Sequence, residues 1–342
     1  MRVAMYYSNS DVRIENMPVP EIGADELLVK IKASGVCGTD VLEWYRLKQA
    51  PRVLGHEITG EVVEIGKDVK SFKPGDRVFV SHHVPCNTCY YCLSEKHTVC
   101  HTLHTTNFDP GGFSEYLRVP AINVDRGTFV LPEETSYDNG VFIEPLACVV
   151  RGQRLAGLRH GQTVLILGSG FSGLLHLAMA RLSGITRIIT TDVSDFRLDL
   201  ARRLGATASF SADQDIASLV RKNNNGRLAD LVIVCTGAFS AFNQALSSVD
   251  RGGTVLCFAT TEPGVNLPVP INEFWRNGIT LLPSYACSPY DITVAIDLIN
   301  SGRLPLDELI THRLPLDECQ RAFQLVAEAG DSMKVVIKPF GD

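Results

Sequence analysis

TVLILGSGFSG, residues 163–173, sets the fold of the middle of this chain. Its first five residues form a continuous apolar run, which is typical of a strand buried on both faces of a parallel sheet. The rest reads G-x-G-x-x-G and opens a helical pattern. Its three glycines permit, in turn, a tight bend, close approach of the backbone to a pyrophosphate, and close packing of helix on strand. The segment therefore predicts a dinucleotide site at a helix N-terminus. The residues expected to line it are Gly168, Gly170, Phe171, Ser172 and Gly173.

An acidic residue follows the next predicted strand. Asp192 comes about 20 residues after the glycines, where a carboxylate binds the adenosine ribose hydroxyls. Because it would repel a 2′-phosphate, we expect NAD rather than NADP. Arg197 is expected either to interact with Asp192 or the adenine, or to be an exposed helix charge. Thr236, at the end of a later strand, is expected beside the cofactor.

Strands and helices alternate through the middle of the chain, whereas the first part contains short alternating runs separated by Gly and Pro. The first pattern predicts an α/β, doubly wound Rossmann sheet, and the second a mainly antiparallel β domain. A helix at 290–300 and a strand at 334–338 follow, and the strand is expected to pair back with the first domain. The expected boundaries are 1–147 for the β domain, 148–283 for the Rossmann domain and 284–342 for the returning segment.

Composition excludes several other classes. The 342 residues are 45% hydrophobic and 20% charged, with a net charge of −6, so we expect a globular chain that binds no nucleic acid. The longest apolar stretches are far short of the roughly 20 residues of a membrane span. The N-terminus lacks the apolar region of a signal peptide, and we therefore expect a cytoplasmic protein without membrane partners.

Four of the ten cysteines are clustered in the spacing C-x2-C-x2-C-x7-C. Four thiolates on one loop, here residues 86–100, suit a tetrahedral structural zinc that stabilises the loop. Two histidines, His97 and His101, are reserve ligands, although solvated loop side chains are the simpler interpretation. The predicted structural ligands are Cys86, Cys89, Cys92 and Cys100.

A second set of metal-binding residue types is dispersed along the chain. Cys37 lies in a turn, His56 and Glu57 are adjacent, and Glu144 precedes the Rossmann pattern. Each residue is ordinary alone, but a cysteine, a histidine and a carboxylate together make the mixed site of a catalytic zinc. This set therefore predicts a second zinc ion in each chain.

These motifs resemble those of the zinc-containing medium-chain dehydrogenase/reductase superfamily, in its sorbitol and threonine dehydrogenase branch. The resemblance covers nearly the whole chain and is carried by the glycine turn, the four-cysteine loop, CGTD at 37–40, GHEITG at 55–60, GGFSEY at 111–116 and IEPL at 143–146. It implies a GroES-like catalytic domain in which Cys37 and His56 hold the catalytic zinc. Glu57 and Glu144 both remain candidates for the next ligand, and Cys148 is a weaker rival.

The resemblance also implies an NAD-linked oxidation of a secondary alcohol, in which Thr39 accepts the proton. Leu42 stands where many relatives carry a relay histidine, so the proton is expected to leave through the cofactor ribose and water. Trp44 and Tyr285 fall where relatives line the substrate pocket. Glu43 replaces the tyrosine of sorbitol dehydrogenase, which argues against sorbitol itself.

The substrate therefore stays open. A polyol or sugar-like alcohol is expected first, and an amino alcohol, as in L-threonine 3-dehydrogenase, is the alternative. A non-enzymatic NAD-binding protein is the distant alternative. The resemblance further implies a homodimer or homotetramer.

Overall fold

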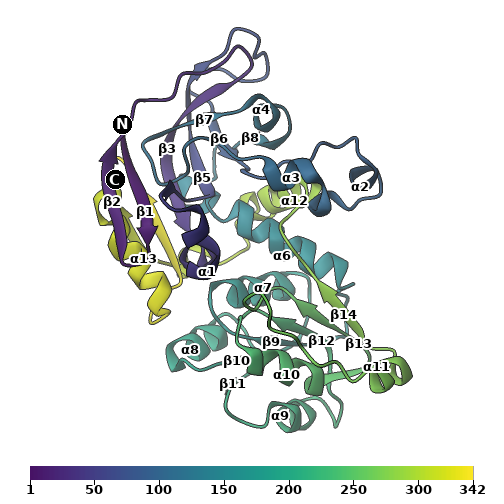
Figure 1. The fold of residues 1–342 in the computed structure, drawn as a ribbon. Helices are drawn as coiled ribbons and strands as arrows, with labels where there is room; N and C mark the ends of the chain where they lie inside the picture. Colours follow the sequence, from purple (N-terminus) through teal and green to yellow (C-terminus); the bar gives the residue numbers. More distant parts are fainter. Residues whose placement is uncertain (342) are drawn as a thin grey trace. The chain divides into compact units, whose positions relative to one another are not determined.

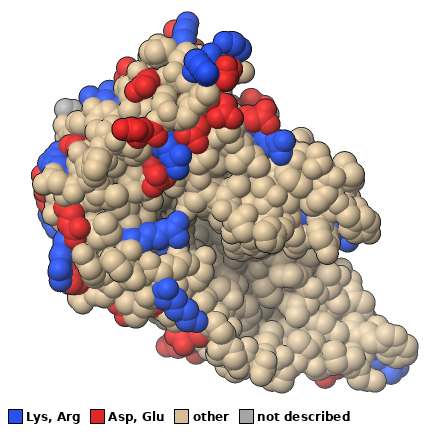
Figure 2. Space-filling model, turned by 45° about the horizontal axis from the view of Figure 1, so that its top comes forward, with Lys and Arg blue, Asp and Glu red and all other residues tan. Residues whose placement is uncertain are grey.

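The computed structural model describes residues 1–341, and the chain forms two compact units. No helix among these residues is long and apolar enough to cross a bilayer. On the face shown in Figure 2, Lys and Arg side chains lie among Asp and Glu side chains rather than in a basic patch. Unit 1 comprises Met1–Ala147, Cys287–Gly302 and Leu306–Asp342, and unit 2 comprises Cys148–Ala286 and Arg303–Pro305.

Unit 2 is built on a six-stranded parallel sheet in the order β11-β10-β9-β12-β13-β14. In chain order this is third, second, first, fourth, fifth and sixth, the order of a doubly wound dinucleotide-binding fold. The strands are β9 (Thr163–Leu167), β10 (Arg187–Asp192), β11 (Ala208–Ser211), β12 (Ala229–Val234), β13 (Val249–Cys257) and β14 (Thr280–Pro283). The helices are α7 (Phe171–Leu182), α8 (Asp195–Arg203), α9 (Ile216–Asn223), α10 (Phe239–Ser248) and α11 (Ile271–Asn277).

Burial explains why this sheet forms. All five residues of β9 are buried, since helices cover both faces of the sheet (Figure 1). On one face Leu165, Val232 and Val255 pack with Val220 and Phe242 of the helices α9 and α10. The predicted Rossmann fold is confirmed.

Unit 1 contains two sheets. The larger has seven strands in the order β15-β16-β3-β5-β6-β8, with β7 paired to β3, and the smaller has the order β2-β1-β4. All pairs are antiparallel except β15 and β16, so the mainly antiparallel expectation is confirmed. The strands are β1 (Arg2–Ser8), β2 (Asp11–Asn16), β3 (Leu27–Val36), β4 (Arg52–Val53), β5 (Glu57–Ile65), β6 (Arg77–Val80), β7 (Tyr116–Val119), β8 (Thr128–Val130), β15 (Ile310–Pro315) and β16 (Lys334–Lys338).

Short helices connect these strands, and two longer helices lie in the C-terminal part of the chain. The α-helices are α1 (Glu43–Arg46), α2 (Tyr90–Leu93), α3 (His101–Thr105), α4 (Ala121–Gly127), α5 (Tyr137–Gly140), α12 (Pro289–Asn300) and α13 (Cys319–Glu328). Helix α6 (Ile143–Leu155) begins in unit 1 and continues past Ala147 into unit 2. The 3-10 turns are η1 (Gly38–Val41), η2 (Leu47–Gln49), η3 (His97–Val99), η4 (Leu306–Leu309) and η5 (Leu316–Glu318).

The end of the chain returns to unit 1. Strand β16 pairs antiparallel with β3, with Val335 opposite Val36, as predicted for the strand at 334–338. Helix α13 packs beside β1 and β2, where Phe323 lies 5.5 Å from the ring of Tyr6. Figure 1 shows this yellow segment beside the purple N-terminal strands. The return brings residues near 334 to the end of β3.

Candidate metal and cofactor sites

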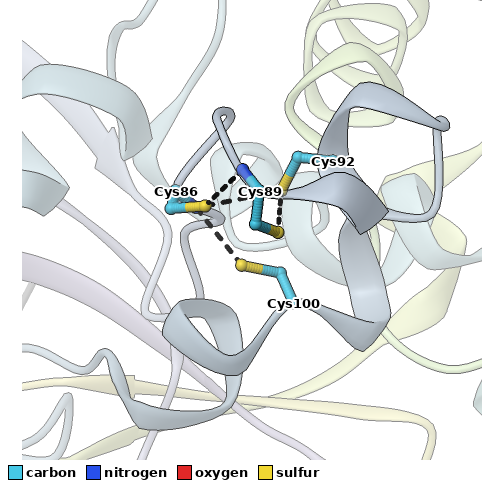
Figure 3. A group of neighbouring side chains, drawn as sticks. All are labelled: Cys86, Cys89, Cys92 and Cys100. Carbon is cyan, nitrogen blue, oxygen red and sulfur yellow. Dashed lines mark hydrogen bonds between the residues drawn. The ribbon is translucent and has the colours of Figure 1, made fainter.

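The four clustered cysteines converge in unit 1, as Figure 3 shows. The sulfur of Cys92 lies 3.9 Å from that of Cys86 and 3.6 Å from that of Cys89. Zn–S bonds of about 2.3 Å in a tetrahedron place sulfur atoms about 3.8 Å apart. The spacing of the thiols therefore fits a zinc ion. His97 and His101 are not members of this group of ligand atoms among the described residues.

Backbone amides prepare this loop for thiolates. The amides of Thr88 and Cys89 donate to the Cys86 sulfur, at 3.5 and 3.2 Å, and lower the pKa of that thiol to about 5. The amide of Cys86 donates to the sulfur of Cys100 at 3.4 Å. Burial raises the pKa of Cys92 to about 12, and a bound cation would favour its thiolate form.

The second group comprises Cys37, His56 and Glu57, whose ligand atoms all lie within 4.8 Å of one another. Strand pairing explains the convergence, because Gly35 of β3 lies opposite Glu57 of β5. Cys37 follows the end of β3 and His56 precedes β5. Two residues that are 19 positions apart in sequence thus meet at one end of a strand pair.

Glu57 is fully buried, and its two oxygens differ. Oε2 accepts a 2.6 Å hydrogen bond from Nζ of Lys334 on β16, a lysine that is also buried. The carboxylate crosses β3 at Gly35, where a Cβ atom would lie 2.1 Å from Oε2. Oε1 is buried and has no hydrogen-bond partner among residues 1–341. A buried carboxylate oxygen is rarely left unpaired, and a metal ion would satisfy it.

His56 is oriented by a carboxylate behind it. Its Nδ1 lies 3.4 Å from Oδ1 of the fully buried Asp40, which leaves Nε2 for a metal. Burial works against a charged imidazole, yet Asp40 and Cys37 together hold the pKa of His56 well above its usual value. Two acidic groups thus concentrate negative potential at this ring, a potential that a divalent cation would neutralise.

The glycine turn in unit 2 has the geometry of the fingerprint. Gly168 has φ of +94°, and a Cβ atom at Gly173 would lie 1.9 Å from the carbonyl oxygen of Gly168. Gly170 is open, with only the guanidinium of Arg197 within 4 Å of its Cβ position. Phe171 and Ser172 begin α7, whose N-terminus faces this space. The turn therefore leaves room for a phosphate where side chains would otherwise stand.

Asp192 ends β10 beside this turn. Its Oδ2 accepts a 2.7 Å hydrogen bond from the Ser169 amide, and its Oδ1 accepts one of 3.0 Å from the Ser194 amide. Arg197 of α8 has Nη1 3.8 Å from Oδ1 and is mostly buried, which excludes the exposed-charge interpretation. Thr236 follows β12 and lies against Gly168. All of the predicted cofactor residues in unit 2 thus lie near the carboxyl ends of its parallel strands.

Comparison with known proteins agrees with this arrangement. Residues 23–126 match the alcohol dehydrogenase GroES-like domain and residues 173–301 match the zinc-binding dehydrogenase family. L-threonine 3-dehydrogenase of Bacillus licheniformis is 34% identical over 334 residues, covering 95% of this chain and 94% of its own. Sorbitol dehydrogenase of Gallus gallus is 30% identical over 340 residues, covering 96% and 93%.

The chain belongs to the zinc-containing medium-chain dehydrogenase/reductase superfamily. Within it, the chain falls in the sorbitol and threonine dehydrogenase branch, as the motifs predicted. The solved structure of galactitol-1-phosphate dehydrogenase from Escherichia coli has a TM-score of 0.85 at 27% identity, covering 99% of this chain and 100% of its own. The protein is thus an enzyme, an NAD-dependent zinc alcohol dehydrogenase by class, and the non-enzymatic alternative falls away.

The remaining residues predicted as catalytic or substrate-binding do not form a single group in the structure. The Thr39 hydroxyl donates to the Cys37 sulfur at 3.3 Å. Glu144, on α6, is not in the Cys37 group, and its carboxylate lies within 4.8 Å of the Cys287 thiol. Trp44 is half-buried in unit 1 and Tyr285 is 51% exposed in unit 2. These side chains stay predictions as catalytic or substrate residues.

Three residues of the dehydrogenase site were missed as functional residues. Lys334 donates a hydrogen bond to the Glu57 carboxylate. The Asp40 carboxylate faces Nδ1 of His56. Arg46 of α1 donates hydrogen bonds to Thr39 and Asp40. Asp40 lies inside the quoted CGTD motif, and Lys334 opens an apolar strand where a lysine is unusual. Those were the available signals. Nothing in the pattern around Arg46 marks it.

Proposed function

We propose that the enzyme oxidises a secondary hydroxyl of a polyol or sugar-like alcohol, with zinc held by Cys37, His56 and Glu57. One observation carries the zinc assignment: a thiol, an imidazole and a carboxylate with a buried, unpartnered oxygen lie within 4.8 Å of one another. Three mixed protein ligands are typical of catalytic zinc, whose fourth position stays open for substrate or water. A second zinc in the four-cysteine loop is structural.

The chain's own residues prepare the proton transfer. A zinc ion held by Cys37, His56 and Glu57 would supply Lewis acidity toward the substrate hydroxyl, and bound NAD would supply the hydride acceptor. Thr39, whose hydroxyl lies beside the Cys37 sulfur, would accept the alcohol proton as it passes its own hydroxyl proton to the cofactor ribose and water. Asp40 holds the ring of His56, and Lys334 holds one oxygen of Glu57 and neutralises its charge. Leu42 carries no ionisable group, so the proton leaves Thr39 without the histidine that many relatives use.

Glu57 is proposed over Glu144 as the third ligand. Its unpartnered Oε1 supports this choice, as does its place in the group with Cys37 and His56. We expect Glu57→Gln to weaken zinc binding at this site by more than about 100-fold, since loss of a direct ligand costs more than the 10–100-fold lost when a partner of a ligand is removed. Glu144→Gln is the matched control and should change it less than tenfold. Zinc retained against a graded chelator measures both, and the opposite ranking would establish Glu144 as the ligand.

The substrate class is tested by turnover. The sorbitol dehydrogenase relative supports a polyol, and the L-threonine 3-dehydrogenase relative supports an amino alcohol. Glu43 argues against sorbitol itself but does not distinguish other polyols from amino alcohols. A panel of polyols, sugar alcohols, secondary alcohols and L-threonine, followed by NADH absorbance with NAD and NADP side by side, separates the two. The highest kcat/KM with L-threonine would replace the polyol proposal.

Asp192 is proposed to select NAD through the adenosine ribose. We expect Asp192→Ala to lower kcat/KM for NAD by about 10- to 100-fold, the effect of losing hydrogen bonds to a charged group. The preference for NAD over NADP should narrow at the same time, because the repulsion of a 2′-phosphate is lost. Initial rates with both cofactors measure the ratio. Asp195→Ala, an acidic residue three positions on, is the control, and an unchanged ratio in Asp192→Ala would contradict the assignment.

We also propose that the enzyme is a homodimer or homotetramer assembled through unit 2. Strand β14 is the outer strand of its sheet, and Leu281 is 38% exposed. Helix α11 exposes Ile271 at 71% and Trp275 at 80%, and Val265 is 46% exposed. An exposed edge strand flanked by apolar side chains is suited to pairing with a second copy.

Trp275→Glu should dissociate that oligomer. A charge at the centre of an apolar interface costs several kcal/mol, so we expect a dissociation constant at least about 100-fold higher. Analytical ultracentrifugation gives the mass of each variant. Leu93→Glu, 74% exposed on α2 of unit 1, is the control and should leave the mass unchanged. A wild-type monomer, or an unaltered oligomer in Trp275→Glu, would contradict this surface.

The two units are proposed to divide the work. Unit 1 holds both zinc groups and is proposed as the catalytic domain, and unit 2 is proposed as the NAD-binding domain. We propose a cytoplasmic location, because the cysteines of the two zinc groups must stay reduced to bind metal.

A further inference from the structure

Arg46 contacts Thr39, the proposed proton acceptor. It ends helix α1, and its side chain is only 12% exposed. Its Nε donates to the carbonyl oxygen of Thr39 at 2.9 Å, and its Nη2 lies 3.4 Å from the Thr39 hydroxyl. The guanidinium also packs on the ring of Tyr45, at 4.7 Å from the ring centroid. One planar cation thus holds the Thr39 backbone and reaches its side chain.

The same guanidinium reaches the residue that orients His56. Nη2 of Arg46 lies 3.3 Å from Oδ1 of Asp40, the oxygen that faces Nδ1 of His56. Asp40 is fully buried, and its Oδ2 also accepts a 3.1 Å hydrogen bond from the Cys37 amide. Arg46 is therefore a shared partner of the proton acceptor and of the carboxylate behind a zinc ligand.

We propose that Arg46 is a positioning residue that fixes the Thr39 hydroxyl relative to the zinc ligands. A hydroxyl has one hydrogen and two lone pairs. Arg46 approaches one lone pair, and the other is then left for the substrate hydroxyl. Because the guanidinium fork bonds the Thr39 carbonyl and Asp40 together, it holds the hydroxyl and the His56 ring in one geometry. This role rests on the proposed function of Thr39. It would fix the position of the Thr39 hydroxyl in a site where Leu42 replaces the relay histidine of many relatives.

Kinetics provide the first test. We expect Arg46→Ala to lower kcat by about 10- to 100-fold while KM for the alcohol changes by less than about threefold. Guanidinium chloride at about 20 mM should restore part of the lost kcat, because the free cation can occupy the vacated space. Arg46→Lys keeps the charge without the fork and should retain more activity than Arg46→Ala. Arg52→Ala is the matched control, since Arg52 donates to Gln49 rather than to Thr39.

A second readout needs neither the catalytic zinc nor turnover. In protein that holds only the loop zinc and carries labelled threonine methyl groups, the Thr39 methyl should report one side-chain rotamer in wild type and Arg52→Ala, and averaging among rotamers in Arg46→Ala. Thr39→Ser assigns the signal. The proposal is overturned if Thr39 keeps one rotamer in Arg46→Ala, or if the kcat of that variant stays within twofold of Arg52→Ala. If the wild type oxidises no alcohol, the proposed function fails, and the rotamer result still stands or falls alone.

Discussion

Cys37→Ser should reduce kcat by at least about 10³-fold while the chain stays folded. The variant loses the thiolate of the mixed group, and with it the Lewis acid that lowers the barrier by several kcal/mol. Zinc content should fall from two ions per chain to one, because the four-cysteine loop does not involve Cys37. Elemental analysis, circular dichroism and NADH absorbance measure the three quantities on one preparation.

A matched control separates this effect from general loss of a thiol. Cys319 is a fully buried cysteine in the hydrophobic core of unit 1 and belongs to neither zinc group. Cys319→Ala should keep both zinc ions and most of the activity. Turnover above one tenth of wild type in Cys37→Ser would mean that zinc at this group is not the Lewis acid.

Cys92→Ser should act on stability rather than on the chemical step. The loop 86–100 has few buried side chains of its own, so binding of zinc supplies most of its folding energy. We expect a loss of about 3–5 kcal/mol in the free energy of unfolding and a fall in Tm of roughly 10 °C or more. One zinc should remain, at the mixed group. Thermal unfolding and zinc analysis test both effects.

His97→Ala is the control for the loop. His97 was a reserve ligand, but it lies outside the sulfur group. The variant should keep two zinc ions and a Tm within about 2 °C of wild type, the usual range for a surface substitution. Loss of zinc in His97→Ala, or an unchanged Tm in Cys92→Ser, would show that the four sulfurs do not stabilise the loop by binding zinc.

Local spacing made part of the fold and site predictable. The run 163–167 coincides with β9, and the glycine turn has the expected backbone because its demands are local. The four structural cysteines fall within 15 consecutive residues, so their convergence needs no tertiary information. Apolar strands and short loops of this kind can thus be predicted from local sequence alone.

Residues brought together by strand pairing were harder to predict. Lys334 meets Glu57 across 277 positions, and only the register of β16 on β3 places it there. No periodicity reports that register. Asp40 and Arg46 were missed because a buried acid and a helix arginine acquire meaning only from their partners. The edge strand β14 was missed because Thr280–Pro283 is short and mostly exposed.

Glu144 shows the limit of reasoning from a motif. The family pattern placed it level with Glu57, and sequence offers no means to rank two carboxylates. The buried Oε1 and the lysine behind Oε2 distinguish Glu57 by its surroundings alone.

Zinc-dependent turnover tests the central claim most directly. The exchangeable zinc is removed with a chelator, leaving the ion of the four-cysteine loop, and NADH formation from the best alcohol of the panel is followed as zinc is returned. Activity should rise in proportion to added zinc and saturate at one equivalent, for a total of two ions per chain. Full turnover by the protein that holds only the loop zinc would contradict it.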